Sequence, residues 1–160
     1  MVINSEVSVM SKMIKTLILS SIGLMSCNGM AQMPSGMPKS YIEECASCHT
    51  AYAPRFLNKT NWQNITTDLS HHFGTDATID DKSLAEIAKW LETNAATKGK
   101  SAELSKDNRI TSKRWFLHEH DEVSANTWKR ASIKGPSNCI ACHSKANEGN
   151  FNEHDIRIPK

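Results

Sequence analysis

Apolar side chains recur along most of this chain with the spacing of α-helices, and no stretch shows the strict alternation of a half-buried strand. The clearest pattern starts at Asp80, which can cap a helix, and continues to about Ala96, with Gly99 as the expected stop. The apolar positions of this helix are Leu84, Ile87, Ala88 and Leu91. Because these positions follow helical spacing, we expect them to form one face that packs in the core.

Three shorter helices are predicted from weaker patterns. The first covers residues 41–49, and the second runs from a Thr60 cap to about His71. The third runs from a Thr111 cap to about Asp121. These segments predict a mainly α fold, built of short helices and irregular loops.

Polar segments divide the helical part of the chain. Residues 97–109 are rich in Gly, Ser and Lys and are expected to form a surface loop. The loop would join two halves of a single domain, at about 32–98 and 108–160. Asn138 is expected to start a turn, and the tail 151–160 has no helical pattern and is expected to be irregular.

The N-terminal segment has the pattern of an export signal. Two lysines precede the apolar run 16–25, which is too short to span a bilayer, and a small-x-small pattern ends at Ala31. We therefore expect residues 1–31 to be a Sec-type signal peptide that directs the protein to the periplasm. Met13 opens a more ordinary signal and is the alternative start.

Two other outcomes are open for this segment. It could stay attached as a short amphipathic anchor. Alternatively, residues 24–27 resemble a bacterial lipobox, in which Cys27 would be acylated and would become the N-terminus of a lipid-anchored protein. All three outcomes place the functional domain outside the cytoplasm.

Composition limits what the domain can bury by itself. The 160 residues include only 6% aromatic side chains and 22% charged ones, so a cofactor or cross-link would be needed to supplement the core. The formal net charge is +2, with no long run of basic residues. Nucleic-acid binding is therefore not expected.

Two copies of the pattern Cys-x-x-Cys-His carry the chemistry of the chain. The paired thiols are Cys45 and Cys48 in the first copy, and Cys139 and Cys142 in the second. This spacing lets both thiols form thioethers with one porphyrin, and the adjacent histidine is held beneath the iron. The pattern predicts two covalent haem c groups, with His49 and His143 as proximal ligands.

Other functions of paired cysteines fit this sequence less well. Two Cys-x-x-Cys pairs could share a zinc ion, and one pair could be a redox dithiol. However, a histidine follows both pairs directly, and the pairs are some ninety residues apart without a zinc-ribbon hairpin. No βαβ pattern surrounds either pair, which disfavours a thioredoxin-like function.

The second axial ligand of each iron decides what each haem can do. All seven methionines fall at or before Met37. Only Met33 and Met37 follow the predicted cleavage site, and both lie in a Pro/Gly-containing segment that is poorly suited to hold a ligand. Methionine ligation is therefore not expected.

Histidines outside the motifs are more numerous. His72 and His120 are the best candidates for distal ligands, because each is placed beside a phenylalanine ring, adjacent in sequence or at helical spacing. His71, His118 and His154 are the reserves. The residues alone do not assign a distal histidine to a particular haem.

Taken together, these motifs resemble the small dihaem cytochromes c of proteobacteria. The matching pieces, in order, are Glu44-Cys45-x-x-Cys48-His49, Tyr52-Ala53-Pro54, Trp62, His72-Phe73-Gly74, Asp76-Ala77, Trp115-Phe116, Glu119-His120, Asn138-Cys139-x-x-Cys142-His143 and Ile156-Arg157-Ile158-Pro159. The resemblance implies bis-histidine ligation of both haems, with His72 and His120 as distal ligands. It also implies an electron carrier whose partners are a membrane cytochrome b and, in some members, a soluble monohaem cytochrome.

The expected function is therefore single-electron transfer in the periplasm, without a small-molecule substrate. One alternative is a dihaem peroxidase-like enzyme, in which one iron opens to bind peroxide. Another is a haem-bearing sensor or accessory subunit of a membrane redox complex. In the tail, Arg157 is expected either to pack on the protein or to lie near a haem propionate.

Overall fold

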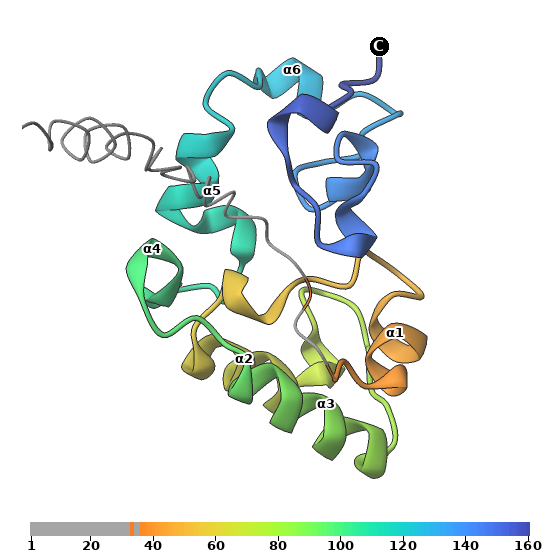
Figure 1. Ribbon diagram of the computed structural model, residues 1–160. Coiled ribbons are helices and arrows are strands. Elements are labelled where there is room, and N and C mark those ends of the chain that lie inside the picture. Colours follow the sequence, from red (N-terminus) through yellow and green to blue (C-terminus); the bar gives the residue numbers. More distant parts are fainter. Residues whose placement is uncertain (1–32, 34–35) are drawn as a thin grey trace, which may run out of the picture.

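The computed structural model describes Met33 and residues 36–160 (Figure 1). Within that range the regular structure is helical, and β-pairing is limited to isolated bridges. The prediction of a mainly α fold is confirmed. The predicted signal peptide and Cys27 lie outside the described residues.

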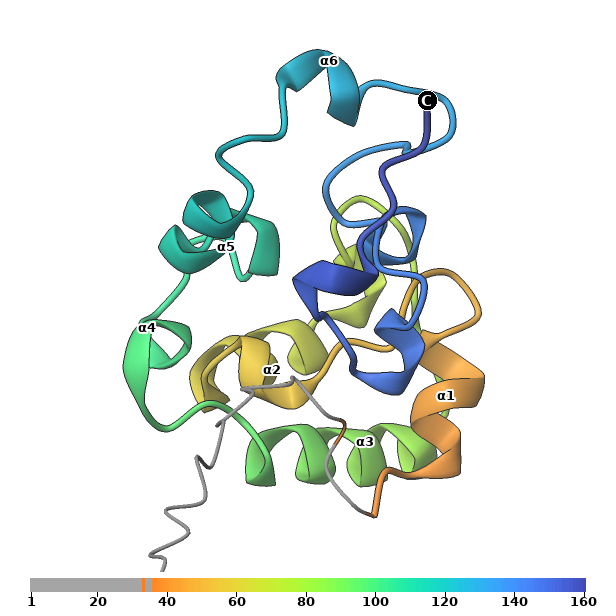
Figure 2. The ribbon, with the colours of Figure 1, turned by 45° about the horizontal axis from the view of Figure 1, so that its top comes forward.

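Six short α-helices form the framework of the described chain: α1 (Lys39–Cys45), α2 (Lys59–Thr67), α3 (Asp81–Thr93), α4 (Gly99–Ala102), α5 (Arg114–Glu119) and α6 (Ala125–Trp128). Single turns of 3-10 helix connect them, at Pro54–Phe56, Leu69–His71, Ile110–Ser112, Cys139–Ala141, Ala146–Glu148 and Glu153–Asp155. Figures 1 and 2 show α1, α2 and α3 gathered at one end of the molecule, with α5 and α6 toward the other. No helix among the described residues combines the length and apolar character needed to cross a bilayer.

The apolar core lies in the first half, where α3 packs against α1 and α2. The buried cluster consists of Tyr41, Ala51, Leu57, Trp62, Ile87, Trp90, Leu91 and Ala95. Ile87 and Leu91 belong to the predicted face of α3, so that prediction is confirmed. Met33 and Met37 pack against the same cluster, where they extend the core.

The second half buries much less apolar surface. Its buried hydrophobic side chains are Phe116, Ile133 and Ala146. Its helices are also short, with six residues in α5 and four in α6. Short helices gain little from their own hydrogen bonds and need tertiary packing. This half therefore depends on something other than its own side chains for a core.

Helix α3 starts as predicted. The Asp80 carboxylate accepts hydrogen bonds from the backbone N–H groups of Lys82 and Ser83, at 3.0 Å each. Hydrogen bonding from Ser83 and Lys82 favours the charged carboxylate and holds the pKa of Asp80 below its usual range.

The predicted end of α3 at Ala96 is wrong, because the helix ends at Thr93. The backbone N–H and the side-chain amide of Asn94 both donate to the Trp90 carbonyl, at 3.1 and 2.9 Å. The backbone N–H of Ala96 instead donates to the Leu57 carbonyl, also at 2.9 Å. Pairing with the segment before α2 thus replaces the last helical turn.

The first predicted helix is also shorter than expected, since α1 ends at Cys45 and does not reach His49. The Ser47 hydroxyl donates to the Glu44 carbonyl at 2.9 Å. Serine side chains compete in this way with helical backbone bonds. The first Cys-x-x-Cys-His motif therefore leaves the helix after its first cysteine and continues as a turn.

At the start of α2, Asn58 is the cap and the predicted Thr60 is not. The Asn58 side chain accepts from the Asn61 backbone N–H at 2.8 Å. Its amide group also donates to the Ala102 carbonyl at 3.0 Å. Asparagine is the better N-cap of the two residue types, and here it gains a second partner.

At its other end, α2 stops at Thr67 and not near His71 as predicted. Asp68 leaves the helical region with φ −133° and ψ 57°, and the 3-10 turn Leu69–His71 follows. This break changes the direction of the chain just before His72.

The segment 97–109 is not the simple surface loop that was predicted. Gly99, the expected stop, begins the short helix α4 instead, with φ +68°. Ser105 is buried, and its backbone N–H and C=O both bond to the side chain of Asn61. The Asn61 amide also donates to the Asn108 side chain at 2.7 Å. A buried asparagine on α2 therefore fixes the linker to the first half.

Thr111 does not cap the third predicted helix. It lies within the 3-10 turn Ile110–Ser112, which closes when the Lys113 N–H donates to the Ile110 carbonyl at 3.1 Å. Helix α5 begins after Lys113, whose side chain makes no capping bond.

Helix α5 ends at Glu119, two residues before the predicted Asp121, and α6 follows without having been predicted. The Ser124 hydroxyl caps α6 by accepting from the Thr127 N–H at 3.2 Å. A four-residue helix is too short to produce an apolar periodicity that the sequence could show.

Candidate haem-binding sites

The first motif follows α1 and places its histidine beside two other rings. The His49 Nδ1 donates to the Thr50 carbonyl at 2.7 Å, which leaves Nε2 free for a metal. The Tyr52 ring stacks on the His49 ring, with centroids 4.7 Å apart and planes inclined by 18°. The His72 ring faces His49 with its centroid 6.1 Å away and its plane inclined by 21°.

A strained turn directs His72 toward His49. Phe73, the next residue, has φ +52°, a left-handed conformation that is costly for a side chain with a Cβ. The Arg109 guanidinium lies over the Phe73 ring, 4.2 Å from its centroid. Burial, and then the charges of His49 and Arg109, lower the pKa of His72. A neutral imidazole at neutral pH is the form that binds metals.

The neighbouring His71 lies elsewhere. Its Nδ1 bonds to the Asp68 carboxylate at 2.7 Å, and its side chain is 80% exposed. Hydrogen bonding to Asp68 raises the pKa of His71. The structure thus places His72 opposite His49 and leaves His71 on the surface.

The second motif forms the 3-10 turn Cys139–Ala141, and Asn138 precedes it as predicted. The backbone N–H of His143 donates to the Cys139 carbonyl at 2.8 Å, which closes the turn. Burial, and then the charge of His120, lower the pKa of His143. Its Nδ1 is buried without a protein partner, so the ring has bonding capacity that the protein does not use.

His120 faces His143 from the end of α5. The ring centroids are 6.1 Å apart and the planes are inclined by 73°. The His120 Nδ1 donates to the Phe116 carbonyl at 2.9 Å, and the two rings stack with centroids 4.1 Å apart. The i, i+4 relation to Phe116 seen in the sequence therefore fixes the orientation of His120.

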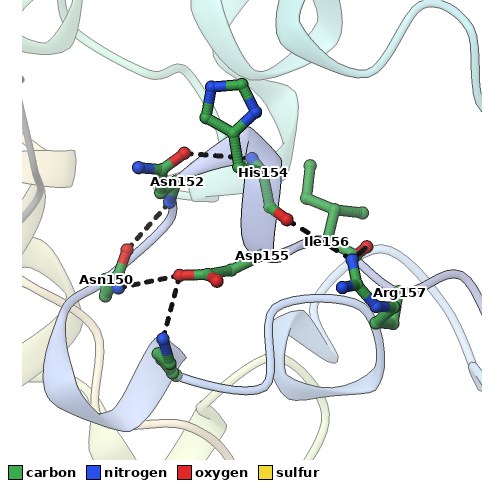
Figure 3. A network of polar contacts seen from close by, with 7 residues as sticks. Asn150, Asn152, His154, Asp155, Ile156 and Arg157 are labelled. Carbon is green, nitrogen blue, oxygen red and sulfur yellow. Dashed lines mark hydrogen bonds and ion pairs between the residues drawn. The ribbon is translucent and has the colours of Figure 1, made fainter.

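The remaining candidate histidines are not brought to either site. The His118 side chain is 68% exposed and lies 3.9 Å from the Asp121 carboxylate. In Figure 3 the His154 ring points away from the polar contacts of its neighbours. Its backbone N–H donates to the Asn152 side chain at 3.0 Å.

The C-terminal tail supports the second motif. The Asp155 carboxylate accepts from Lys145 at 3.1 Å and from Asn150 at 3.2 Å (Figure 3). The backbone N–H of Arg157 donates to the Cys142 carbonyl at 2.9 Å. The Arg157 guanidinium donates to the Ile156 carbonyl at 2.7 Å, so its side chain packs locally on the tail.

None of the four motif cysteines forms a disulfide. Burial raises the pKa of Cys45 and of Cys139 to about 11. A reactive redox dithiol needs the opposite shift, so these pairs do not have the environment of a thioredoxin-like site. Among the described residues, no three His, Cys, Asp or Glu side chains converge as a metal-binding group.

Two thiol pairs, each beside a histidine that faces a second histidine, define the class as a c-type cytochrome with two haem sites. The model of the dihaem cytochrome c family matches residues 41–151 of the chain. The chain therefore belongs to the dihaem cytochrome c family, and its cofactors are two covalent haem c groups. The family resemblance seen in the sequence is confirmed.

Solved structures agree with this assignment. A dihaem cytochrome c from Shewanella baltica OS155 is 32% identical, with a TM-score of 0.66, and the match covers 76% of this chain and 92% of that chain. Two structures from Rhodobacter sphaeroides are 34% and 35% identical, with TM-scores of 0.65 and 0.62. Their matches cover 72% of this chain and 98% and 97% of theirs. None of the curated proteins compared with the chain matches it.

Local sequence patterns did not predict a role for two residues near the sites. Tyr52 belongs only to the set of residues that resemble the family, and Arg109 belongs to no predicted motif. Tyr52 follows His49 by three positions, a spacing that could have suggested a shared face. Arg109 is 37 positions from His72, and no local pattern could have joined them.

Proposed function

We propose that the protein is a periplasmic single-electron carrier in which both haem irons have two histidine ligands. His49 and His72 would hold one iron, and His143 and His120 the other. The motif histidines would be proximal and the other two distal. This proposal also pairs each distal histidine with a particular haem, which the sequence left open.

The spacing of the rings is the observation that carries the proposal. Both histidine pairs have their ring centroids 6.1 Å apart. An imidazole nitrogen binds a first-row metal at about 2 Å and the ring centre lies about 1 Å further back, so two rings on one iron are about 6 Å apart. Direct stacking would bring the rings closer, as for Phe116 and His120 at 4.1 Å.

The ring nitrogens support the same assignment. The Nδ1 atoms of His49 and His120 are held by backbone carbonyls, which fixes the tautomer that presents Nε2 to a metal. The pKa values of His72 and His143 are lowered, so both remain neutral where a ligand must be neutral. Each pair thus contains one ring held by the backbone and one kept neutral chiefly by burial.

Two occupied axial positions favour electron transfer over catalysis. A bound haem would supply the one-electron chemistry, whereas the chain sets potential and access through ligand, burial and local charge. A peroxidase-like reaction needs an iron with an open position. A membrane cytochrome b is the proposed donor and a soluble monohaem cytochrome the proposed acceptor. Export by the N-terminal segment would place the protein between them.

Carbon monoxide tests this function, because it binds ferrous haem only where an axial position is open. The absorption spectrum of the dithionite-reduced protein is expected to change very little when carbon monoxide is added. A full shift of one haem's Soret band within the mixing time would contradict the proposal and would favour a ligand-binding or peroxidase-like haem.

A further inference from the structure

Tyr52 contacts the first haem-binding motif and the segment just before the second. Its ring stacks on His49 at 4.7 Å, and its hydroxyl donates to the carbonyl of Ser137 at 2.7 Å. Ser137 lies two residues before Cys139, and the hydroxyl bond joins positions 85 residues apart. One side chain therefore connects the axial histidine of the first site to the segment that carries the second.

Haem attachment changes which side chains can donate a hydrogen bond to the Ser137 carbonyl. The Cys139 thiol lies 3.7 Å from the same oxygen and can donate to it as a free thiol. A thioether sulfur has no proton to donate. Once Cys139 is attached to a haem, the Tyr52 hydroxyl remains as its side-chain donor.

The position of Tyr52 is fixed at its backbone as well. Its carbonyl accepts a hydrogen bond from the hydroxyl of Tyr41, at 2.7 Å. Tyr41 is 2% exposed and belongs to the core of the first half. Tyr52 thus extends from a rigid core toward the second half.

The same segment contacts the second half at a further point. The Phe56 ring meets the Phe151 ring edge-on at 5.3 Å, and Phe151 in turn lies 5.3 Å from His143. The two halves would therefore stay in contact if the Tyr52 hydroxyl were removed. A change at Tyr52 can then be tested without separating the sites.

We propose that Tyr52 is a positioning residue for electron transfer between the two haem sites. Its ring orients His49, and its hydroxyl holds that ring at a fixed separation from the second motif. The transfer moves one electron, so one iron is oxidised from Fe(II) to Fe(III) while the other is reduced from Fe(III) to Fe(II), without proton release. The rate of such a step falls steeply with distance, so a looser separation slows it. This inference rests on the proposed function.

Tyr52→Phe tests the proposal, because it removes the hydroxyl and keeps the ring. The oxidised protein is reduced by less than one equivalent in a radiolytic pulse, and the absorbance relaxation that follows reports equilibration between the haems. Loss of this hydrogen bond is expected to slow the relaxation relative to that of the unaltered protein, because the bond holds the two sites at a fixed separation. Haem content and the spectrum of each haem are expected to stay unchanged. Tyr52→Leu is expected to slow the relaxation further and to alter the spectrum of the haem held by His49.

Thr93→Val is the matched control, since it removes a hydroxyl-to-carbonyl bond of the same length, from Thr93 to Lys89 at 2.7 Å, inside the first half and without a partner in Tyr52. It is expected to leave the relaxation rate unchanged. An unchanged rate in Tyr52→Phe, or equal slowing in Thr93→Val, would overturn the proposal. Those results would leave the proposed function intact, whereas rapid carbon monoxide binding by the unaltered protein would remove that function first.

Discussion

Replacing His72 with alanine is expected to open one iron of this protein, and replacing His120 is expected to open the other. Each ring faces a motif histidine at 6.1 Å, so its removal leaves an axial position without a protein ligand. Each reduced single variant is expected to bind one carbon monoxide per protein, and the double variant two. A titration of the dithionite-reduced variants, followed by absorption in the Soret region, measures this stoichiometry.

The chain offers matched controls for both changes. His71 directly precedes His72, and His118 lies two positions before His120. Their side chains are 80% and 68% exposed, and they pair with Asp68 and Asp121. Alanine at either position is expected to leave the protein unreactive toward carbon monoxide. The assignment is wrong if a control variant binds carbon monoxide, or if the His72 and His120 variants do not.

The second expected result concerns folding. A variant with Cys139→Ala and Cys142→Ala, which cannot attach the second haem covalently, is expected to lose most ordered structure between residues 110 and 160. That half buries only Phe116, Ile133 and Ala146 among its hydrophobic side chains. Ordering each residue costs about 1–2 kcal/mol of backbone entropy, which so few buried side chains cannot offset.

Hydrogen exchange followed by mass spectrometry measures this loss segment by segment. Amides in α5 and in the C-terminal tail are expected to exchange rapidly in the variant, while α2 and α3 keep their protection. The reciprocal variant, Cys45→Ala with Cys48→Ala, is expected to retain partial protection in α2 and α3, because the buried cluster lies there. Full protection of residues 110–160 in the first variant would show that this half folds without its haem.

The sequence contained the information for the haem motifs and for helix α3. Both depend on local spacing, whether of cysteines and a histidine or of apolar side chains after the Asp80 cap. Some faulty predictions arose where another group takes a helical partner. The Ser47 hydroxyl binds the Glu44 carbonyl where α1 ends, and the Ala96 N–H pairs with the Leu57 carbonyl just beyond the end of α3. Asn58 also replaces Thr60 as a cap because it gains a partner from α4.

Contacts between segments that are distant in the sequence could not be read from local patterns. Facing rings such as His49 and His72 come from separate segments, and a broken helix turns His72 inward while leaving His71 outside. Tyr52 reaches the second motif across 85 positions, which no periodicity reveals. Neighbouring phenylalanines identified His72 and His120 as candidates and the family resemblance supported them, and the fold supplies a geometric reason for choosing them.

Electron paramagnetic resonance of the fully oxidised protein tests the central claim of two bis-histidine irons most directly. The spectrum is expected to contain two low-spin ferric signals and no high-spin signal. Near-parallel imidazole planes, as at His49 and His72 with 21°, separate the iron d orbitals and give a rhombic signal. Near-perpendicular planes, as at His143 and His120 with 73°, leave these orbitals almost equal in energy and give a signal with one large g value. A high-spin signal from either iron would contradict the account, because it would show an iron without its second histidine.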